Sequence, residues 1–183
     1  MKATGIVRRI DDLGRIVIPK EIRRVLHIRE SDPLEIFTEH DGSIVLRKYS
    51  PIGDMGNVAK PYVESLAQVS GHAALIADRD HIIAASGSGN RQLIHKTISK
   101  ELEARMNARE MICASADDRK FIPITLEQTD LEIYHEVVIP ILTQGDVVGA
   151  VILLSNQERN PMSEVEIKLA QSAAGFLGKQ LEQ

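Results

Sequence analysis

The sequence is poor in aromatic residues and almost without cysteine. It has no tryptophan, and aromatic residues make up only 3% of its 183 residues. Proteins that hold single-stranded nucleic acid commonly stack bases on aromatic side chains, so this scarcity argues against that class. The single cysteine, Cys113, excludes an intramolecular disulfide, and its apolar neighbours predict a buried structural thiol.

Long apolar runs are also missing. No stretch approaches the roughly 18 apolar residues of a membrane-spanning helix, and the first residues lack the apolar segment of a secretory signal. We therefore expect a cytoplasmic protein that makes no membrane contact. Hydrophobic residues at 43% and charged residues at 26% are ordinary for a globular protein, which excludes a disordered or collagen-like chain.

The formal net charge of -4 is the sum of segments with opposite net charges. Taken over the whole chain, it argues against a nucleic-acid-binding protein, which usually has a basic domain. Residues 1–29, however, hold eight Lys and Arg against three Asp and Glu, a net charge of +5, whereas residues 30–50 have -3 and residues 51–183 have -6. Basic charge is therefore concentrated at the N-terminus.

A change in composition divides the chain. Residues 50–57 contain one proline and two glycines, as a domain boundary would. We expect a first domain over residues 1–50, a linker over residues 51–56 and a second domain over residues 57–183.

The first domain is expected to be all-β with one short helix. Asp41-Gly42 is a hairpin signal between two β-branched runs, and Pro19 suits the first turn of a helix. A domain of 50 residues buries little apolar area and usually needs a disulfide, a metal or oligomerisation. Cysteine is absent there, and His27 and His40 have no metal-ligand spacing, so oligomerisation remains. The expected strands are residues 5–10, 15–18, 34–38 and 43–47.

The second domain is expected to be an α+β sandwich that ends in a capped helix. Its elements follow the order helix, hairpin, helix, strands and helix, and Ser163 with Glu166 forms a capping box. The last helix has apolar residues on two faces, one of which can cover its own sheet. We predict that a coiled-coil-like seam on this helix contacts a second copy, the alternative being that both faces are buried within one domain. The seam comprises Ile167, Ala170, Ala174, Leu177 and Leu181.

The basic N-terminal segment is rich in arginine, which suits bidentate contacts with phosphate and with guanine. Charge counting leaves two interpretations open: a surface that binds nucleic acid, or a solvated basic face paired with Asp11, Asp12 and Glu21. The candidate residues are Arg8, Arg9, Arg15, Arg23 and Arg24.

Residues 1 to about 50 resemble the DNA-binding domain of AbrB-type transition-state regulators. The resemblance lies in the run Thr4-Gly5-Ile6-Val7-Arg8 through Arg15-Ile16-Val17-Ile18-Pro19 and continues to Leu26. It implies a swapped-hairpin β-barrel, an intertwined dimer that binds AT-rich double-stranded promoter DNA with loose sequence preference. The DNA-contacting arginines of the family fall on Arg8, Arg15, Arg23 and Arg24, and Arg9 stands where the motif often keeps a basic residue.

The second domain resembles a GAF sensor fold, through its order of elements and the hairpin around Gly145. The residue set of cyclic-nucleotide-binding GAF domains is not evident, so we expect no cyclic nucleotide and no cofactor. Gly87-Ser88-Gly89 predicts a loop and not a phosphate cradle. His135-Glu136 begins like a zinc-protease motif, but Ile139 replaces the second histidine, so we expect no metal and no catalytic residue.

The resemblance implies a regulator that activates and represses sporulation genes in the forespore. Dimer contacts at both ends of the chain predict a homotetramer, a dimer of dimers, whose GAF-like domain oligomerises and senses an unknown small ligand. An antitoxin is the first alternative, because toxin–antitoxin partners use related swapped-hairpin domains. An enzyme built on the GAF-like pocket is the second, and it rests on fold analogy alone.

Overall fold

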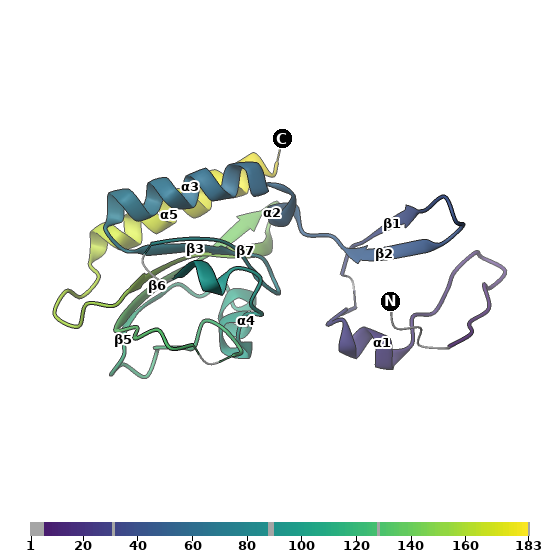
Figure 1. Cartoon of the computed structure of the whole chain (residues 1–183), viewed down its shortest axis with the longest axis horizontal. Coiled ribbons are helices and arrows are strands. Elements are labelled where there is room, and N and C mark those ends of the chain that lie inside the picture. Colours follow the sequence, from purple (N-terminus) through teal and green to yellow (C-terminus); the bar gives the residue numbers. More distant parts are fainter. Residues whose placement is uncertain (1–5, 31, 88–89, 128, 183) are drawn as a thin grey trace. The chain divides into compact units, whose positions relative to one another are not determined.

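The computed structural model describes residues 6–30, 32–87, 90–127 and 129–182. The chain divides into two compact units, Met1–Tyr49 and Ser50–Gln183, which we call unit 1 and unit 2 (Figure 1). Each unit has its own sheet, so each is described by itself.

Unit 1 consists of a short helix and one hairpin. Helix α1 spans Lys20–Val25, after Pro19, and strands β1 (Leu34–Thr38) and β2 (Ile44–Lys48) pair antiparallel. At the turn Gly42 has φ +85°, which favours glycine, and the Ser43 amide donates a 2.8 Å hydrogen bond to Asp41 Oδ1. The hairpin signal therefore marks a real turn.

Two further strands of unit 1 were expected, over residues 5–10 and 15–18. Residue 5 lies outside the described residues, and residues 6–18 form a turn with loops on both sides and no strand. A strand requires a hydrogen-bonded neighbour, and among the described residues unit 1 offers only the β1–β2 pair. Residues 6–18 therefore have no ladder partner among the described residues of unit 1.

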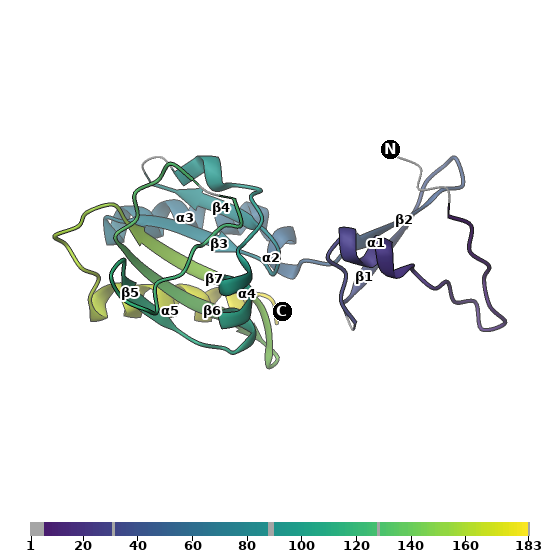
Figure 2. The same cartoon turned by 90° about the horizontal axis from the view of Figure 1, so that it is seen from below.

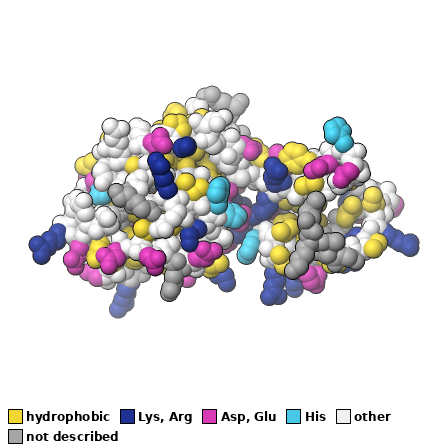
Figure 3. Space-filling model, viewed as in Figure 1, with side chains coloured by type: hydrophobic (Ala, Val, Ile, Leu, Met, Phe, Trp, Pro, Cys, Tyr) yellow, Lys and Arg dark blue, Asp and Glu magenta, His cyan; other side chains and the backbone are white. Residues whose placement is uncertain are grey.

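The apolar side chains of unit 1 are largely uncovered. Helix α1 has no buried residue, and Val7, Val17 and Val25 are 89%, 72% and 75% exposed. On the hairpin, Ile36 is 68% and Ile44 62% exposed. Figure 3 shows hydrophobic side chains on the visible face of this unit.

Unit 2 is a five-stranded antiparallel sheet covered on both faces. The strands lie in the order β4-β3-β7-β6-β5. Helices α3 and α5 lie side by side on one face, and α4 with the neighbouring loops covers the other (Figures 1 and 2). The elements are α2 (Pro51–Asp54), α3 (Gly56–Ser70), β3 (Ala73–Ala77), β4 (Ile82–Ser86), the 3-10 helix η1 (Asn90–Leu93), α4 (Lys100–Asn107), β5 (Ile112–Ser115), β6 (His135–Thr143), β7 (Asp146–Ser155) and α5 (Glu164–Gln180).

The segment 51–56, expected as a linker, begins unit 2. Pro51 starts helix α2, and the Ser50 hydroxyl caps it by accepting from the Gly53 amide at 3.0 Å. Ile52 is 0% exposed and belongs to the core between the sheet and helices α3 and α5. The proline and glycines of this segment therefore start a short helix and do not loosen the chain.

Helix α5 has the predicted capping box, with Ser163 as its N-cap and Glu166 accepting from the Ser163 amide at 2.6 Å. Its predicted seam, however, packs against the sheet of its own unit. Ala170, Ala174 and Leu177 are 0%, 4% and 0% exposed, because they form the core against the sheet. Ile167 and Leu181 pack against the same core. The oligomerisation contact expected on these five residues is thus corrected: they are the helix's internal face.

Candidate nucleic-acid interface

The turn from Asp11 to Gly14 holds Arg15 in place. Asp11 Oδ1 accepts from the amides of Leu13 at 3.0 Å and Arg15 at 2.8 Å, and Asp11 Oδ2 accepts from Arg15 Nε at 2.8 Å. Gly14 permits this turn with φ +75°. The hydrogen bonds from Arg15 keep the pKa of Asp11 below its ordinary value, so the carboxylate is charged at neutral pH.

The Asp11 contact orients the Arg15 guanidinium and still leaves it accessible. The Arg15 side chain is 69% exposed although its Nε is bonded. A guanidinium held along one edge presents its remaining N–H groups in a fixed direction, which suits a phosphate or a guanine edge. The predicted ion pairing of the basic face with Asp11 is therefore present, and it positions Arg15 without covering it.

Helix α1 carries Arg23 and Arg24 in its last turn. Arg24 is exposed and Arg23 is half-buried. The end of this helix is tied to the hairpin because Lys48 Nζ donates to the His27 carbonyl at 2.9 Å and lies 3.4 Å from Asp32 Oδ2. The two arginines thus stand on a helix that is anchored to β2.

The remaining predicted arginines, Arg8 and Arg9, are both exposed in the loop before the turn. One further basic residue of unit 1 was missed. Arg47 on β2 is exposed, with its guanidinium 5.1 Å from the centre of the Phe37 ring. The net charge of -3 over residues 30–50 obscured it, and nothing in the sequence marked its proximity to Phe37, which lies on the neighbouring strand.

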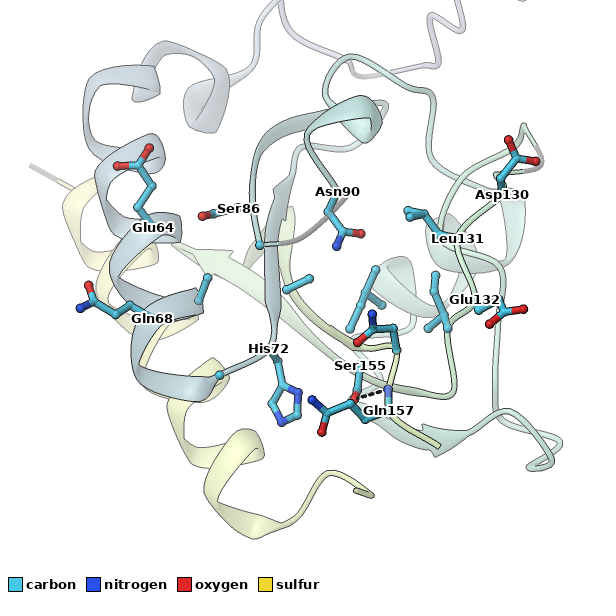
Figure 4. A pocket seen from close by; sticks show the side chains of 17 residues that line it. Glu64, Gln68, His72, Ser86, Asn90, Asp130, Leu131, Glu132, Ser155 and Gln157 are labelled. Carbon is cyan, nitrogen blue, oxygen red and sulfur yellow. Dashed lines mark hydrogen bonds between the residues drawn. The ribbon is translucent and has the colours of Figure 1, made fainter. Parts of the chain in front are cut away.

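Unit 2 has a large polar cavity near the end of helix α3. Its volume is about 750 Å³. Three of its polar side chains, His72, Asn90 and Ser155, are more than nine-tenths buried (Figure 4). Gly87 lies on its wall, whereas Ser88 and Gly89, of the loop predicted there, lie outside the described residues.

Among the described residues, no group of three or more His, Cys, Asp and Glu could hold a metal ion, and no helix is long and apolar enough to cross a membrane. Both ring nitrogens of His135 are engaged, Nδ1 with Ser115 Oγ at 2.8 Å and Nε2 with the Glu158 carbonyl at 3.0 Å.

Cys113 differs from the prediction. It is exposed on β5, which is an edge strand of the sheet. Partial desolvation and the nearby Glu166 carboxylate raise the pKa of its thiol. A raised pKa disfavours the thiolate, so the exposure does not make this cysteine a nucleophile.

A family model matches each unit of the chain. The family model "Stage V sporulation protein T C-terminal, transcription factor" matches residues 54–182, and the model "Antidote-toxin recognition MazE, bacterial antitoxin" matches residues 7–54. Stage V sporulation protein T of Bacillus subtilis (strain 168) is 50% identical over 183 residues, which is the whole of both chains.

Each unit also has relatives of its own. The transition state regulatory protein AbrB of the same organism is 59% identical over 51 residues, which are 28% of this chain and 52% of AbrB. A GAF domain of PixJ from Thermosynechococcus elongatus matches 74% of this chain and 89% of its own, with 15% identity and a TM-score of 0.55, so it shares the fold of unit 2. The architecture is thus an AbrB-like N-terminal domain followed by a GAF-like α+β domain, and the chain belongs to the family of stage V sporulation protein T.

Proposed function

We propose that this protein regulates transcription during sporulation by binding promoter DNA through unit 1 as an intertwined dimer. The observation that carries the proposal is that unit 1 combines its concentration of arginine with an apolar surface that a single chain leaves open. AbrB and stage V sporulation protein T, to which the chain is similar, are named as a transition state regulatory protein and a sporulation protein.

The dimer follows from the missing core of unit 1. Burying apolar surface stabilises a protein by about 25 cal/mol per Å². In a single chain the exposed valines and isoleucines of unit 1 contribute little of this stabilisation, because most of their surface remains in water. A second copy would supply neighbours for residues 6–18 and cover the exposed face of the hairpin. We therefore assign unit 1 to a swapped-hairpin β-barrel made by two chains.

The DNA contact follows from charge and geometry. Two copies bring two segments of net charge +5 together, enough to neutralise several phosphates and release their counterions. Arg15 on its turn and Arg23 and Arg24 on α1 are held by hydrogen-bonded local structure, while Arg8 and Arg9 are exposed. We propose that these five arginines contact double-stranded promoter DNA, mainly through its backbone.

The test measures DNA affinity against salt concentration for single Arg→Ala variants. Each lost phosphate contact should weaken binding and reduce the slope of log K against log salt by about 0.9. Arg119→Ala, an exposed arginine of unit 2, is the matched control and should leave the slope unchanged. If the unit 1 variants keep the wild-type slope, the assignment is refuted.

We also propose that unit 2 pairs chains through the outer face of α3 and α5, so that pairing at both ends builds a tetramer. Val165 is 62% and Phe176 41% exposed on α5, and the Phe176 ring stacks on Tyr62 of α3 with centroids 5.1 Å apart. Val69 of α3 is 67% exposed. An apolar stripe shared by two neighbouring helices suits a four-helix contact with the same stripe of a second copy.

The oligomeric state of the full chain tests this contact. The double variant Val165→Ser with Phe176→Ser should convert a tetramer to a dimer in light scattering, since the contact in unit 1 remains. Leu126→Ser, at a residue 58% exposed in a loop of unit 2, is the control and should remain tetrameric. A double variant with wild-type mass would refute the contact.

The family match over residues 7–54 keeps an antitoxin as a second candidate. Unit 2 argues against it, because it is a folded regulatory domain where an antitoxin has a short toxin-binding tail. We propose that unit 2 senses a small ligand and does not catalyse a reaction. Co-purification of a small endoribonuclease with the protein would favour the antitoxin instead.

A further inference from the structure

Helix α1 is too short to hold its own position. It has six residues, Lys20–Val25, and within the described chain it has no side-chain cap at its N-terminus and no buried residue. A helix of this length is not stable alone in water, because nucleation is costly and most helical stability in proteins comes from tertiary contacts. Contacts outside the helix must therefore fix Arg23 and Arg24, which it carries.

The chain reverses direction at His27, directly after α1. The Ile28 amide donates to the Arg23 carbonyl at 2.8 Å, across the end of the helix. His27 itself has φ +51°, the left-handed conformation in which helices commonly end. Its carbonyl accepts from Lys48 Nζ of β2 at 2.9 Å. The end of α1 is thus bound to a residue far along the chain.

Lys48 joins this carbonyl to a largely buried carboxylate. Its Nζ lies 3.4 Å from Asp32 Oδ2, and the two side chains are 24% and 6% exposed. The same Oδ2 accepts from the Arg29 amide at 2.8 Å. Removing one member of such a pair is costly, because the other charge is left poorly compensated away from water. We call Lys48, Asp32 and the His27 carbonyl the α1 clamp.

The Lys48 ammonium is directed into unit 1. It donates to a carbonyl and pairs with a carboxylate there, and most of its side chain is covered. The Arg15 side chain, by contrast, is 69% exposed. We therefore expect Lys48 to act on DNA binding through α1 and not by contacting a phosphate.

We propose that the α1 clamp positions Arg23 and Arg24 for DNA binding by holding α1 on β2 in one orientation. Fixing a charged side chain beforehand lowers the ordering cost that binding would otherwise include. The inference rests on the DNA binding proposed above for unit 1, and it adds Lys48 and Asp32 as positioning residues. The clamp lies within one chain, so it does not depend on the contact proposed for unit 2.

Asp32 gives a test in which charge and position predict opposite signs. Asp32→Asn removes a negative charge from a domain proposed to bind a polyanion, which by itself would strengthen binding. It also breaks the ion pair with Lys48, so we expect DNA binding to weaken about fivefold, as for the loss of a charge-assisted hydrogen bond. Fluorescence anisotropy of the full chain with a labelled AT-rich duplex measures the affinity.

Glu39→Gln is the matched control, since Glu39 is an exposed carboxylate of the same unit. It should bind DNA as tightly as wild type or more tightly. Asp32→Asn with the affinity of Glu39→Gln would overturn the proposal.

Two variants of Lys48 separate positioning from phosphate contact. Lys48→Gln should weaken DNA binding but keep the wild-type slope of log K against log salt, whereas a lost phosphate contact would reduce that slope by about 0.9. Lys48→Arg keeps the charge and should bind more tightly than Lys48→Gln. A reduced slope for Lys48→Gln, or no recovery with Lys48→Arg, would overturn the proposal.

Double variants show whether the clamp acts through α1. The effect of Lys48→Gln on DNA affinity should shrink in a chain that already has Arg24→Ala, because the contact to be positioned is gone. It should stay undiminished with Arg8→Ala, since Arg8 lies in the loop before the Asp11 turn. Equal effects in the two backgrounds would overturn the proposal, and a general loss of structure in unit 1 would give that result.

Wild-type DNA binding separates this inference from the proposed function. If the wild-type chain binds the duplex and both Asp32→Asn and Lys48→Gln bind it equally well, only the role of the clamp is refuted. If the wild-type chain does not bind the duplex, the proposed function is refuted and the clamp has no binding to support.

Discussion

The backbone N–H of Ile122 donates a 2.9 Å hydrogen bond to Glu136 Oε1 in the interior of unit 2. Glu136 is 0% exposed, and its Oε2 has no hydrogen-bond partner among the described residues. Burial raises the pKa of this carboxyl to about 7, against the smaller lowering effect of the Ile122 amide. An acid in the core of the sheet therefore changes charge near neutral pH.

We predict that unit 2 loses stability as the pH rises from about 4.5 to about 7. In this range the unfolded chain has lost the proton of Glu136 and the folded chain keeps it, so the free energy of unfolding falls with pH. Above about 7 the folded protein holds a buried charge, at a cost on the order of 3 kcal/mol. Thermal unfolding at pH 5 and pH 8 measures the difference.

Glu136→Gln isolates this contribution. The amide is neutral at every pH and can still accept from Ile122, so the variant should resemble wild type at pH 5 and be more stable at pH 8. Glu101→Gln, exposed on α4, should keep the wild-type profile. A Glu136→Gln variant with an unchanged pH dependence would show that the pKa of Glu136 is not raised.

Replacing Gly175 and replacing Gly178 of α5 by alanine should have opposite effects on the stability of unit 2. A Cβ added at Gly178 would lie 2.2 Å from the Leu142 carbonyl oxygen, whereas at Gly175 nothing lies within 4 Å. We expect Gly178→Ala to destabilise unit 2 by about 3 kcal/mol, because α5 must move away from β6. Gly175→Ala should stabilise it by roughly 0.5–1 kcal/mol through helix propensity. Denaturant unfolding compares them, and equal effects would contradict the close approach.

Replacing Asp11 and replacing Asp12 in unit 1 should affect DNA binding differently. Both are negative in a surface proposed to bind DNA, so removing either charge should by itself strengthen binding. Asp11 also holds the turn and Arg15; its loss should weaken DNA binding about fivefold, which corresponds to about 1 kcal/mol. Asp12→Ala lacks this cost and should bind DNA as tightly as wild type or more tightly. Tighter binding by Asp11→Ala, measured by fluorescence anisotropy, would refute the positioning role.

Local signals predicted the elements that one chain completes by itself. The hairpin at Gly42 and the capping box of Ser163 and Glu166 were predicted from nearest-neighbour chemistry, and both are present. The strands expected within residues 6–18 are not formed, because these residues have no ladder partner in either of the two sheets of the described chain. Propensity describes what a segment can adopt, and pairing decides whether it does.

Burial was harder to predict than secondary structure. Helix α5 has apolar residues on two faces, and the regular spacing of Ala170, Ala174 and Leu177 suggested a coiled coil. In the structure that face of α5 packs against the sheet, because small residues allow α5 to approach β6 closely, as at Gly178. The polar cavity could not be predicted at all, because its wall joins residues from 64 to 157 that only the sheet brings together.

Ile52 provides the last prediction, since it decides to which unit the segment 51–54 belongs. Ile52→Ala removes buried methyl groups from the core under α3 and α5, which should cost unit 2 about 2–4 kcal/mol. Asp54→Ala, exposed at the end of the same helix, should cost little. Thermal unfolding measures both. A linker would tolerate the two changes equally. Equal midpoints of thermal unfolding for the two variants would therefore show that this segment is a linker, as its proline and glycines first suggested.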